Sequence, residues 1–395
     1  MVRNSFSDAW ARIVPEAEWM AEFPVCGAAL AADESRIVLD GVPDVPGVSH
    51  RIFSALAEAN IAVDMIGQSV GSEGRATIGF TVIAAELERT KKTLSPIVTD
   101  LGATLREGGR VSKVSVVGAG MRTVSGVAET MFNALSAAGI SMTMITTGDI
   151  KISALIEEDT VELPDAHAGT GTGKKAHEDA KKAVIGRKAL RALHAAFRLD
   201  QPRKGAGVPA EGQYKTKRSP HVAAGEKDRE SAVARLDGME DVLVSGVHLS
   251  PDQSRVTVLD VPDQAGNCAK IFNAVATGGI LVDMIVQNAT APGRAELSFT
   301  VPSSDLTRAL KKTQDVVREI DPACKVVGDS DVAVVYVLGV GMRTHTGVAR
   351  MMFGALASKG INIGMINTSE VCIGVVIEKG HGDQAVACLK DVFEV

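Results

Sequence analysis

Two stretches of the chain repeat a set of residue types that suits a small molecule with both a carboxylate and an ammonium group. The residues are, in chain order, Asp44, Gly47 and Gln68, then Asp263, Gly266 and Gln287. In each set the glycine lies in a turn that leads into a predicted helix, whose first N–H groups and dipole favour an anion. The aspartate carboxylate could hold the ammonium group, and the glutamine amide offers both a donor and an acceptor. The pattern predicts ligand binding and no catalytic group.

Each of these residues also has a structural interpretation. The aspartates could cap the helices that follow them, because a side-chain oxygen at that place accepts a bond from a helix N–H group. The glutamines could be ordinary polar residues at a sheet edge. A further pair of aspartates, Asp64 and Asp283, precedes a methionine that is predicted to be buried. For that pair we favour a structural role over ligand contact.

The two sets belong to an internal repeat that covers most of the 395 residues. Residues 36–82 correspond to residues 255–301 with a constant offset of 219. A second block, which begins at Val117, corresponds to one that begins at Leu338, with an offset of 221. A repeat of this length sets the architecture before any argument from residue propensity.

Each repeat block predicts the order strand, helix, strand, strand, helix, strand. In the first block the residues at 37, 39 and 41 alternate with those at 38, 40 and 42, as the two faces of a strand do. Apolar residues between Val48 and Ala57 recur at helical spacing. Two strands follow, then a second helix over residues 86–101 and a short strand near residues 103–107. This is the order of a ferredoxin-like fold, in which two helices cover one face of an antiparallel sheet. The predicted fold class is therefore α+β, with tandem ferredoxin-like units.

The second unit of each half lacks a final strand downstream. The upstream segments Val25–Leu30 and Val242–Leu249 are otherwise unused, so we expect each to complete the second unit of its half. The first unit of each pair is then inserted within the second. The predicted ranges are about 34–107 for unit 1, about 25–30 plus 110–199 for unit 2, about 253–327 for unit 3, and about 242–249 plus 331–395 for unit 4.

Two stretches interrupt the repeat. Residues 158–184 predict a mobile insertion in the first pair, which spans residues 25–199. Residues 200–237 predict a mobile polar linker before the second pair, which spans residues 238–395. Both carry too little apolar surface to offset the entropy lost on ordering.

Composition excludes several classes of protein. With 45% hydrophobic and 23% charged residues the chain is globular in type, and its net charge of −6 argues against general nucleic-acid binding. No apolar run approaches the roughly 18 residues of a membrane span, so we expect no membrane partner and a cytoplasmic location. The five cysteines form no close pairs and the histidines show no metal-ligand spacing, so we expect neither disulfides nor a metal site.

A resemblance to the regulatory region of aspartate kinases is carried by VPDVPG and IFSALAEANIAVDMIGQSV in the first half, and by GVGMRTHTGVARMMFGALASKGINIGMINTSE in the second. That region is built from ACT domains, which are small modules that bind amino acids. Residues 2–8 also resemble the last strand of the family's catalytic domain, so we expect residues 1–24 to be its remnant. The Lys-Phe-Gly-Gly run of that domain does not precede Met1, so the resemblance implies a regulatory region whose catalytic domain is missing.

The resemblance implies what the chain would do and with which partners. Its expected ligand is an amino-acid effector, lysine or threonine. Binding would inhibit, by feedback, the ATP-dependent phosphorylation of L-aspartate, the first step toward lysine, threonine and methionine. ATP and Mg would be needed only by the missing kinase domain, so we expect no cofactor and no activity in this chain alone. The expected assembly is a homodimer through ACT domains or a complex with a catalytic chain.

In the family the effector lies between two ACT units, and an Asn-Ile pair on the partner unit completes the site. Carried over within the second half, Asn362 and Ile363 would face the binding residues of that half. In the first half the equivalent pair is Ser141 and Met142, which departs from the family pattern. We therefore expect the second half to hold the better site.

Three interpretations of the whole chain stay open at this point. It could be a regulatory subunit, a fragment of a longer and active aspartate kinase, or a structural dimerisation module with vestigial effector sites. An in-frame Lys-Phe-Gly-Gly run upstream would favour the fragment. A failure to bind lysine, threonine or methionine would favour the structural module.

Overall fold

The computed structural model describes residues 25–70, 74–118, 126–148, 151–158, 184–200, 244–291, 293–339, 346–369 and 372–395. The predicted remnant at residues 1–24 lies outside the described residues. So do residues 159–183 of the predicted insertion and residues 201–237 of the predicted linker.

Both halves show the predicted order of elements. The first half contains β1 (Gly27–Pro43), α3 (Val48–Glu58), β2 (Ile66–Val70), β3 (Arg75–Ile83), α4 (Leu87–Asp100), β4 (Thr104–Val117), α5 (Val127–Ala137), β5 (Met144–Gly148), β6 (Lys151–Glu157) and α7 (Val184–Ala196). The second half contains β7 (Val244–Pro262), α9 (Asn267–Thr277), β8 (Ile285–Ala291), β9 (Arg294–Pro302), α10 (Leu306–Ile320), β10 (Lys325–Gly339), α11 (Thr346–Ser358), β11 (Met365–Thr368), β12 (Cys372–Glu378) and α12 (Gly382–Phe393). The α+β class with ferredoxin-like units is confirmed.

Long strands join the two units of each half end to end. β1 runs for 17 residues, and its start at Gly27–Ala31 pairs with the end of β4. The later part of β1 pairs with β3 and with the start of β4. β7 has 19 residues and repeats this arrangement with β9 and β10. Unit 1 is therefore inserted within unit 2, and unit 3 within unit 4, as expected from the upstream segments.

The units that lie side by side come from different halves of the chain. β2 of unit 1 pairs with β11 of unit 4, where Gln68 is opposite Ile366. β5 of unit 2 pairs with β8 of unit 3, where Ile145 is opposite Gln287. These contacts close the strands into one barrel in the order β1-β3-β2-β11-β12-β10-β7-β9-β8-β5-β6-β4. Unit 1 thus pairs with unit 4, and unit 2 with unit 3.

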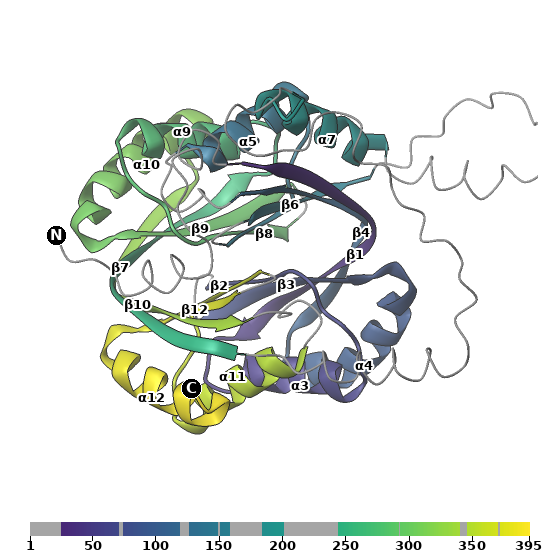
Figure 1. The fold of residues 1–395 in the computed structure, drawn as a ribbon, viewed down its shortest axis with the longest axis vertical. Coiled ribbons are helices and arrows are strands. Elements are labelled where there is room, and N and C mark those ends of the chain that lie inside the picture. Colours follow the sequence, from purple (N-terminus) through teal and green to yellow (C-terminus); the bar gives the residue numbers. More distant parts are fainter. Residues whose placement is uncertain are drawn as a thin grey trace, which may run out of the picture.

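The helices cover the outside of the strands in two layers (Figure 1). One layer contains α5, α7, α9 and α10, and the other contains α3, α4, α11 and α12. Contacts between the halves within each layer include pairs of aromatic rings. The ring centroids of Phe53 and Phe353 lie 5.5 Å apart, and those of Phe132 and Phe272 lie 5.2 Å apart. Each apolar core therefore combines residues of both halves.

The pairing across halves has a physical cause. A strand at the edge of a sheet presents unpaired N–H and C=O groups, which favour pairing with another edge. The long strands β1 and β4 place units 1 and 2 end to end, so the edge of one cannot lie beside the edge of the other. Each edge therefore finds its partner in the other half.

Candidate ligand-binding sites between the two halves

The first predicted set of residues lies at the contact between units 1 and 4. The Asp44 site, as we call it, joins Asp44, Gly47 and Gln68 to Asn362 and Ile363 of the facing unit and to Ser49, which the sequence analysis did not single out. The Gln68 Nε2 group donates to the carbonyl of Ile363 at 2.5 Å, and its Oε1 atom accepts from the Ser49 hydroxyl at 2.7 Å. The Asn362 amide donates to Asp44 Oδ1 at 2.8 Å. Polar groups from both halves therefore meet and satisfy one another.

The second predicted set lies at the contact between units 2 and 3. The Asp263 site, as we call it, joins Asp263, Gly266 and Gln287 to Ser141 and Met142 of the facing unit and to Cys268, which the sequence analysis did not single out. The Ser141 hydroxyl donates to Asp263 Oδ1 at 3.1 Å, and Gln287 Nε2 donates to the carbonyl of Met142 at 2.6 Å. The cavity lined by these residues has a volume of only about 20 Å³. That is room for about one water molecule, so an amino acid could enter only if the contact opened.

The expectation that each site forms within one half is wrong. Asn362 and Ile363 contact residues of unit 1, while Ser141 and Met142 contact residues of unit 3. The cause is the edge pairing of β2 with β11 and of β5 with β8, which brings units of different halves together. The Asn-Ile pair of the family pattern therefore completes the Asp44 site, not a site within the second half.

A glycine in the left-handed region begins the helix at each site. The φ angle is 91° at Gly47, before α3, and 99° at Gly266, before α9. Other residues adopt such angles only at a cost. No side chain caps either helix, so the helix-cap interpretation of Asp44 and Asp263 is not supported. Their carboxylates bond instead to side chains of the facing unit.

The two buried glutamines differ in how well they are satisfied. Gln68 is 3% exposed and Gln287 is 5% exposed. Cys268 stands in the second site where Ser49 stands in the first, and Gln287 Oε1 has no hydrogen-bond partner among the described residues. Burial also raises the pKa of the Cys268 thiol, which keeps it uncharged. A buried acceptor without a partner costs about 1–3 kcal/mol, so a donor on a ligand would recover that energy.

The electrostatics of the Asp263 site favour a cationic neighbour. Burial raises the pKa of the Asp263 carboxyl, and the hydrogen bond from Ser141 opposes this only in part. Glu157 raises the same pKa further by charge repulsion, while Arg36 lowers it. An ammonium group beside a carboxylate of this kind would stabilise its ionised form.

Known proteins resemble this chain in sequence and in structure. Residues 36–95, 114–163 and 335–393 match the family model of the ACT domain. Aspartate kinase Ask_LysC of Stutzerimonas stutzeri is 40% identical over 159 residues, which are 40% of this chain and 38% of that protein. An aspartokinase of Helicobacter pylori is 35% identical over 206 residues, which are 51% of this chain and 44% of that protein. The crystal structure of aspartate kinase from Synechocystis matches with a TM-score of 0.73 and 26% identity, over 94% of this chain and 56% of that one.

The chain contains ACT domains and is homologous to aspartate kinases. It spans 38% and 44% of the length of the two curated relatives. The three matched segments lie in units 1, 2 and 4, and unit 3 repeats the same order of strands and helices. Both candidate sites therefore lie at contacts between ACT units.

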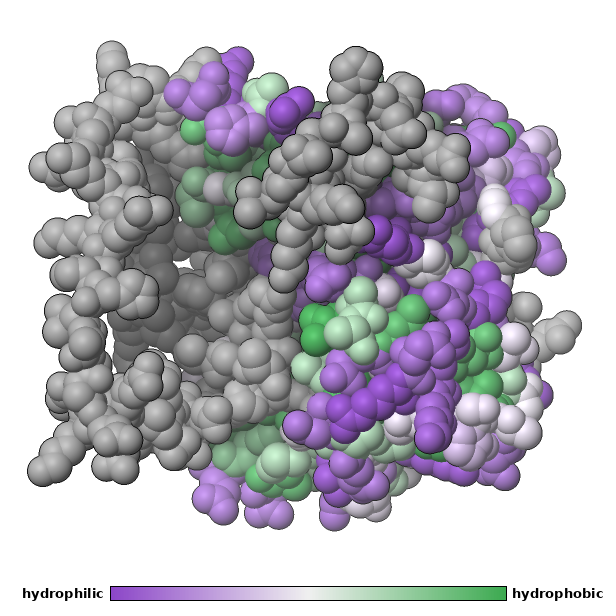
Figure 2. All heavy atoms as spheres, turned by 90° about the vertical axis from the view of Figure 1, so that its right-hand side faces the viewer, coloured by the Kyte–Doolittle hydropathy of each residue, from purple (hydrophilic) through white to green (hydrophobic). Residues whose placement is uncertain are grey.

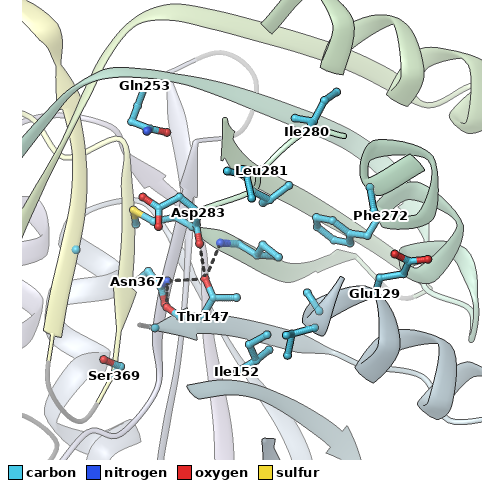
Figure 3. Close-up of a pocket in the computed structure, with 18 of the residues that line it drawn as sticks. Glu129, Thr147, Ile152, Gln253, Phe272, Ile280, Leu281, Asp283, Asn367 and Ser369 are labelled. Atoms are coloured by element: carbon cyan, nitrogen blue, oxygen red, sulfur yellow. Dashed lines mark hydrogen bonds between the residues drawn. The ribbon is translucent and has the colours of Figure 1, made fainter. Parts of the chain in front are cut away.

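A larger cavity, of about 230 Å³, lies where ACT units 2, 3 and 4 meet (Figure 3). Asp283, Thr147 and Asn367 lie in its wall, where the Thr147 hydroxyl donates to the carbonyl of Asp283 at 3.2 Å. The Asn367 amide donates to the carbonyl of Thr147. We did not anticipate this cavity from the sequence. The repeat itself carried a sign of it, because Val334 and Gln253 stand where the first half has Lys113 and Glu34.

Other kinds of site find no support in the part of the chain that the structure describes. There, no group of three or more His, Cys, Asp or Glu residues could hold a metal ion. No helix in the described ranges has the length and apolar character needed to cross a bilayer. Figure 2 shows hydrophilic and hydrophobic residues mixed over the coloured part of the face on the side of β1 and β4.

Proposed function

We propose that this chain is a regulatory region that binds lysine or threonine at the Asp44 and Asp263 sites and thereby controls an aspartate kinase by feedback inhibition. One observation carries the proposal. At each contact between the halves, a carboxylate, a helix N-terminus and a glutamine amide from one ACT unit meet polar groups of another unit. Homology to aspartate kinases supports the link to aspartate phosphorylation.

A free α-amino acid fits the chemistry of these groups. Its carboxylate would lie at the N-terminus of α3 or α9, where N–H groups and the helix dipole favour an anion. Its ammonium group would bond to Asp44 in place of the Asn362 amide, or to Asp263 in place of the Ser141 hydroxyl. The neighbouring glutamine amide would then orient the ligand between the two units.

The position of the sites supports a regulatory role. A ligand in either site would touch two ACT units from different halves of the chain, so it would stabilise one alignment of those halves over another. Feedback control requires such a difference in affinity between two conformations, and tight binding alone is not enough. Under this proposal the small cavity at the Asp263 site, about 20 Å³, belongs to a closed arrangement that ligand entry would open.

The proposed partner is the catalytic part of an aspartate kinase, on the same or on another polypeptide, and a second copy of the chain could form a homodimer through its ACT units. The proposal assigns no role to a nucleotide or a metal ion in effector binding. It assigns binding, and no phosphoryl transfer, to residues 25–395.

A structural module with vestigial effector sites is the second candidate. The observation that favours it is the closed state of the contacts. Side chains of the Asp44 site satisfy one another without a ligand, and the cavity at the Asp263 site has a volume of only about 20 Å³. In this case the contacts would serve only to hold the two halves together.

Calorimetric titration of the purified chain with lysine, threonine and methionine separates the two candidates. A regulatory region is expected to bind one of them saturably and to melt at a higher temperature as the ligand concentration rises. Ligand at 100 times its dissociation constant would stabilise the fold by about 2.7 kcal/mol. The absence of both heat and a melting shift at millimolar ligand would favour the structural module.

Paired variants would then locate the effector. Gln68→Ala removes the amide of the Asp44 site, and Gln287→Ala removes that of the Asp263 site. Because the Asn-Ile pattern completes the Asp44 site, we expect Gln68→Ala to weaken effector binding more, by about tenfold, which is about 1.4 kcal/mol. The exposed Gln314, changed to Ala on α10, is the matched control. Equal losses in the two buried variants would contradict this ranking.

A further inference from the structure

Equivalent places in the two halves hold cavities of very different size. The larger one, which we call the open cavity, lies beside Asp283 and has a volume of about 230 Å³. The smaller one, the closed cavity, lies beside Asp64 and has a volume of about 10 Å³. The two aspartates occupy the same position of the repeat, as do the methionines that follow them, Met65 and Met284. Because the backbone positions are equivalent, the side chains must account for the difference in cavity volume.

The closed cavity holds a lysine side chain of the chain itself. Lys113 extends from β4, is 3% exposed, and places its Nζ atom 2.8 Å from Glu34 Oε1. The same ammonium group pairs with the carboxylate of Asp64. A buried ammonium group is retained only where such partners replace the water it has lost. The two carboxylates and Lys113 therefore form one buried ionic cluster.

The open cavity lacks this cluster because its residues are different. Val334 stands in place of Lys113, and Gln253 stands in place of Glu34. The Asp283 carboxylate accepts a hydrogen bond from the Tyr336 hydroxyl at 2.5 Å, which is an uncharged donor. Among the described residues that line the open cavity, none is a lysine or an arginine, and the charged ones are Asp283 and Glu129. The cavity therefore carries negative charge without a described cation in its wall.

Two buried acceptors in the wall of the open cavity have no hydrogen-bond partner among the described residues. They are Oδ1 of Asn367, a residue that is 5% exposed, and Oε1 of Gln253. Figure 3 shows both residues in the wall of the cavity that also contains Asp283. An ammonium group has three N–H donors and could bond to a carboxylate and to amide oxygens together. The wall thus offers the acceptors that a primary ammonium group requires.

We propose that Lys113 is a built-in occupant of the closed cavity, and that the open cavity takes the ammonium group of a free primary amine in its place. One cavity is then permanently filled by the chain, and the equivalent cavity depends on a ligand. This goes beyond amino-acid binding at the Asp44 and Asp263 sites, because neither cavity shares a polar side chain with those sites.

Exchange of the residues that distinguish the two cavities tests the proposal. The triple variant Glu34→Gln, Lys113→Val and Lys151→Cys gives the closed cavity the residues of the open one at these positions, because Lys151 also lines the closed cavity where Cys372 lines the open one. The reciprocal variant, Gln253→Glu with Val334→Lys, gives the open cavity its own lysine and carboxylate. The probe is n-butylamine, whose four-carbon chain and ammonium group match a lysine side chain, and n-butanol is the uncharged control.

Methyl NMR of methionines reads each cavity separately, because Met284 lines the open cavity and Met65 lines the closed one. In the natural chain, n-butylamine is expected to shift the Met284 methyl signal saturably and to leave the Met65 signal unchanged. The first variant, which removes both lysines from the closed cavity, is expected to gain a saturable shift at Met65. The reciprocal variant is expected to bind n-butylamine about tenfold more weakly at Met284 or not at all.

Several results would overturn the proposal. The first is that n-butylamine does not shift the Met284 methyl signal of the natural chain, or that n-butanol shifts it equally. The others are no Met65 response in a folded first variant, or an unchanged Met284 response in the reciprocal one. If one variant fails to fold, the natural chain and the other variant still decide. Gln68 and Gln287 do not line the open cavity, so effector binding that is lost in their alanine variants is scored apart from the Met284 response, and failure of one proposal leaves the other standing.

Discussion

The Asp44 and Asp263 sites share a backbone arrangement and differ in the side chains that complete it. At both, a glutamine donates to a carbonyl of the facing unit, at 2.5 Å and at 2.6 Å. Ser49 and Asn362 of the first site correspond to Cys268 and Ser141 of the second. As a result the Gln287 amide keeps an acceptor that has no partner among the described residues. Equivalent contacts of the two halves thus keep the same packing while their hydrogen bonding differs.

The largest expected effect tests what the two contacts share. Phe53 and Phe272 occupy equivalent positions, are buried, and each contact two other phenylalanine rings. Phe53→Ala and Phe272→Ala are each expected to lower the free energy of unfolding by about 3–5 kcal/mol, because each leaves a cavity in a core. Urea denaturation measures the loss, with the half-exposed Val327 changed to Ala as control. A much smaller loss at one position would mean that the two contacts are not packed alike.

The next effect tests the difference in hydrogen bonding. Gln68→Ala leaves both the Ser49 hydroxyl and the Ile363 carbonyl without their partner, whereas Gln287→Ala leaves only the Met142 carbonyl. We expect Gln68→Ala to lower the free energy of unfolding by about 1 kcal/mol more than Gln287→Ala, which is the typical net worth of one hydrogen bond. Chemical denaturation of both variants under one set of conditions checks this. Indistinguishable losses would show that the Ser49 bond contributes nothing.

An effect of similar size is expected from exchanging Cys268 and Ser49, the residues that make the surroundings of the two glutamines different. Cys268→Ser introduces a hydroxyl donor where Gln287 Oε1 has no described partner, so the free energy of unfolding is expected to rise by about 0.5–1.5 kcal/mol. Ser49→Cys is expected to lower it by a similar amount. A double-mutant cycle with Gln287→Ala isolates the interaction, because the gain from Cys268→Ser should then vanish. A gain that persists without the glutamine amide would assign it to another cause.

The smallest effect concerns pH. Burial raises the pKa of the Asp263 carboxyl in the folded chain, so as pH increases the unfolded chain loses this proton first. The folded chain then binds more protons than the unfolded one, and this group's contribution to stability falls as pH rises between its unfolded and folded pKa values. Asp263→Asn removes that contribution. We expect the stability of the natural chain relative to Asp263→Asn to fall as pH rises through the acid range, in urea denaturation at several pH values. A rise would contradict the assigned direction.

Much of each unit was predictable from local patterns. Helical spacing from Val48 to Ala57 depends only on which face of a helix is buried, and alternation over residues 37–42 indicated a strand, although the structure buries both faces of it at residues 37–39. The glycines before α3 and α9 could also be placed, because a sharp turn before a helix often needs the left-handed angle that they adopt. The aspartate, glycine and glutamine of each site were therefore predicted before their partners were known, whereas Ser49 and Cys268 were not.

The partners were assigned wrongly because edge pairing leaves no local signal. Gln68 bonds to the carbonyl of a residue 295 positions away, and Gln287 to one 145 positions away. The edge strands β2, β5, β8 and β11 all have backbone groups that could pair with any other edge. The sequence of one unit therefore does not predict which unit lies beside it. The unequal cavities were missed for a related reason. Lys113 is an ordinary charged residue in the sequence, and only the fold encloses it with Glu34 and Asp64.

By itself, the sequence determined the repeated ferredoxin-like units and the insertion of one unit within the next. It also placed Asp44 and Asp263 in the turns that precede α3 and α9. These features follow from hydrophobic spacing and turn chemistry within short segments. The tertiary structure alone decided which units meet, that each site combines both halves, and that one cavity encloses Lys113 while its equivalent stays open. These features depend on the long strands that hold the two units of each half end to end and on backbone edges that pair between the halves.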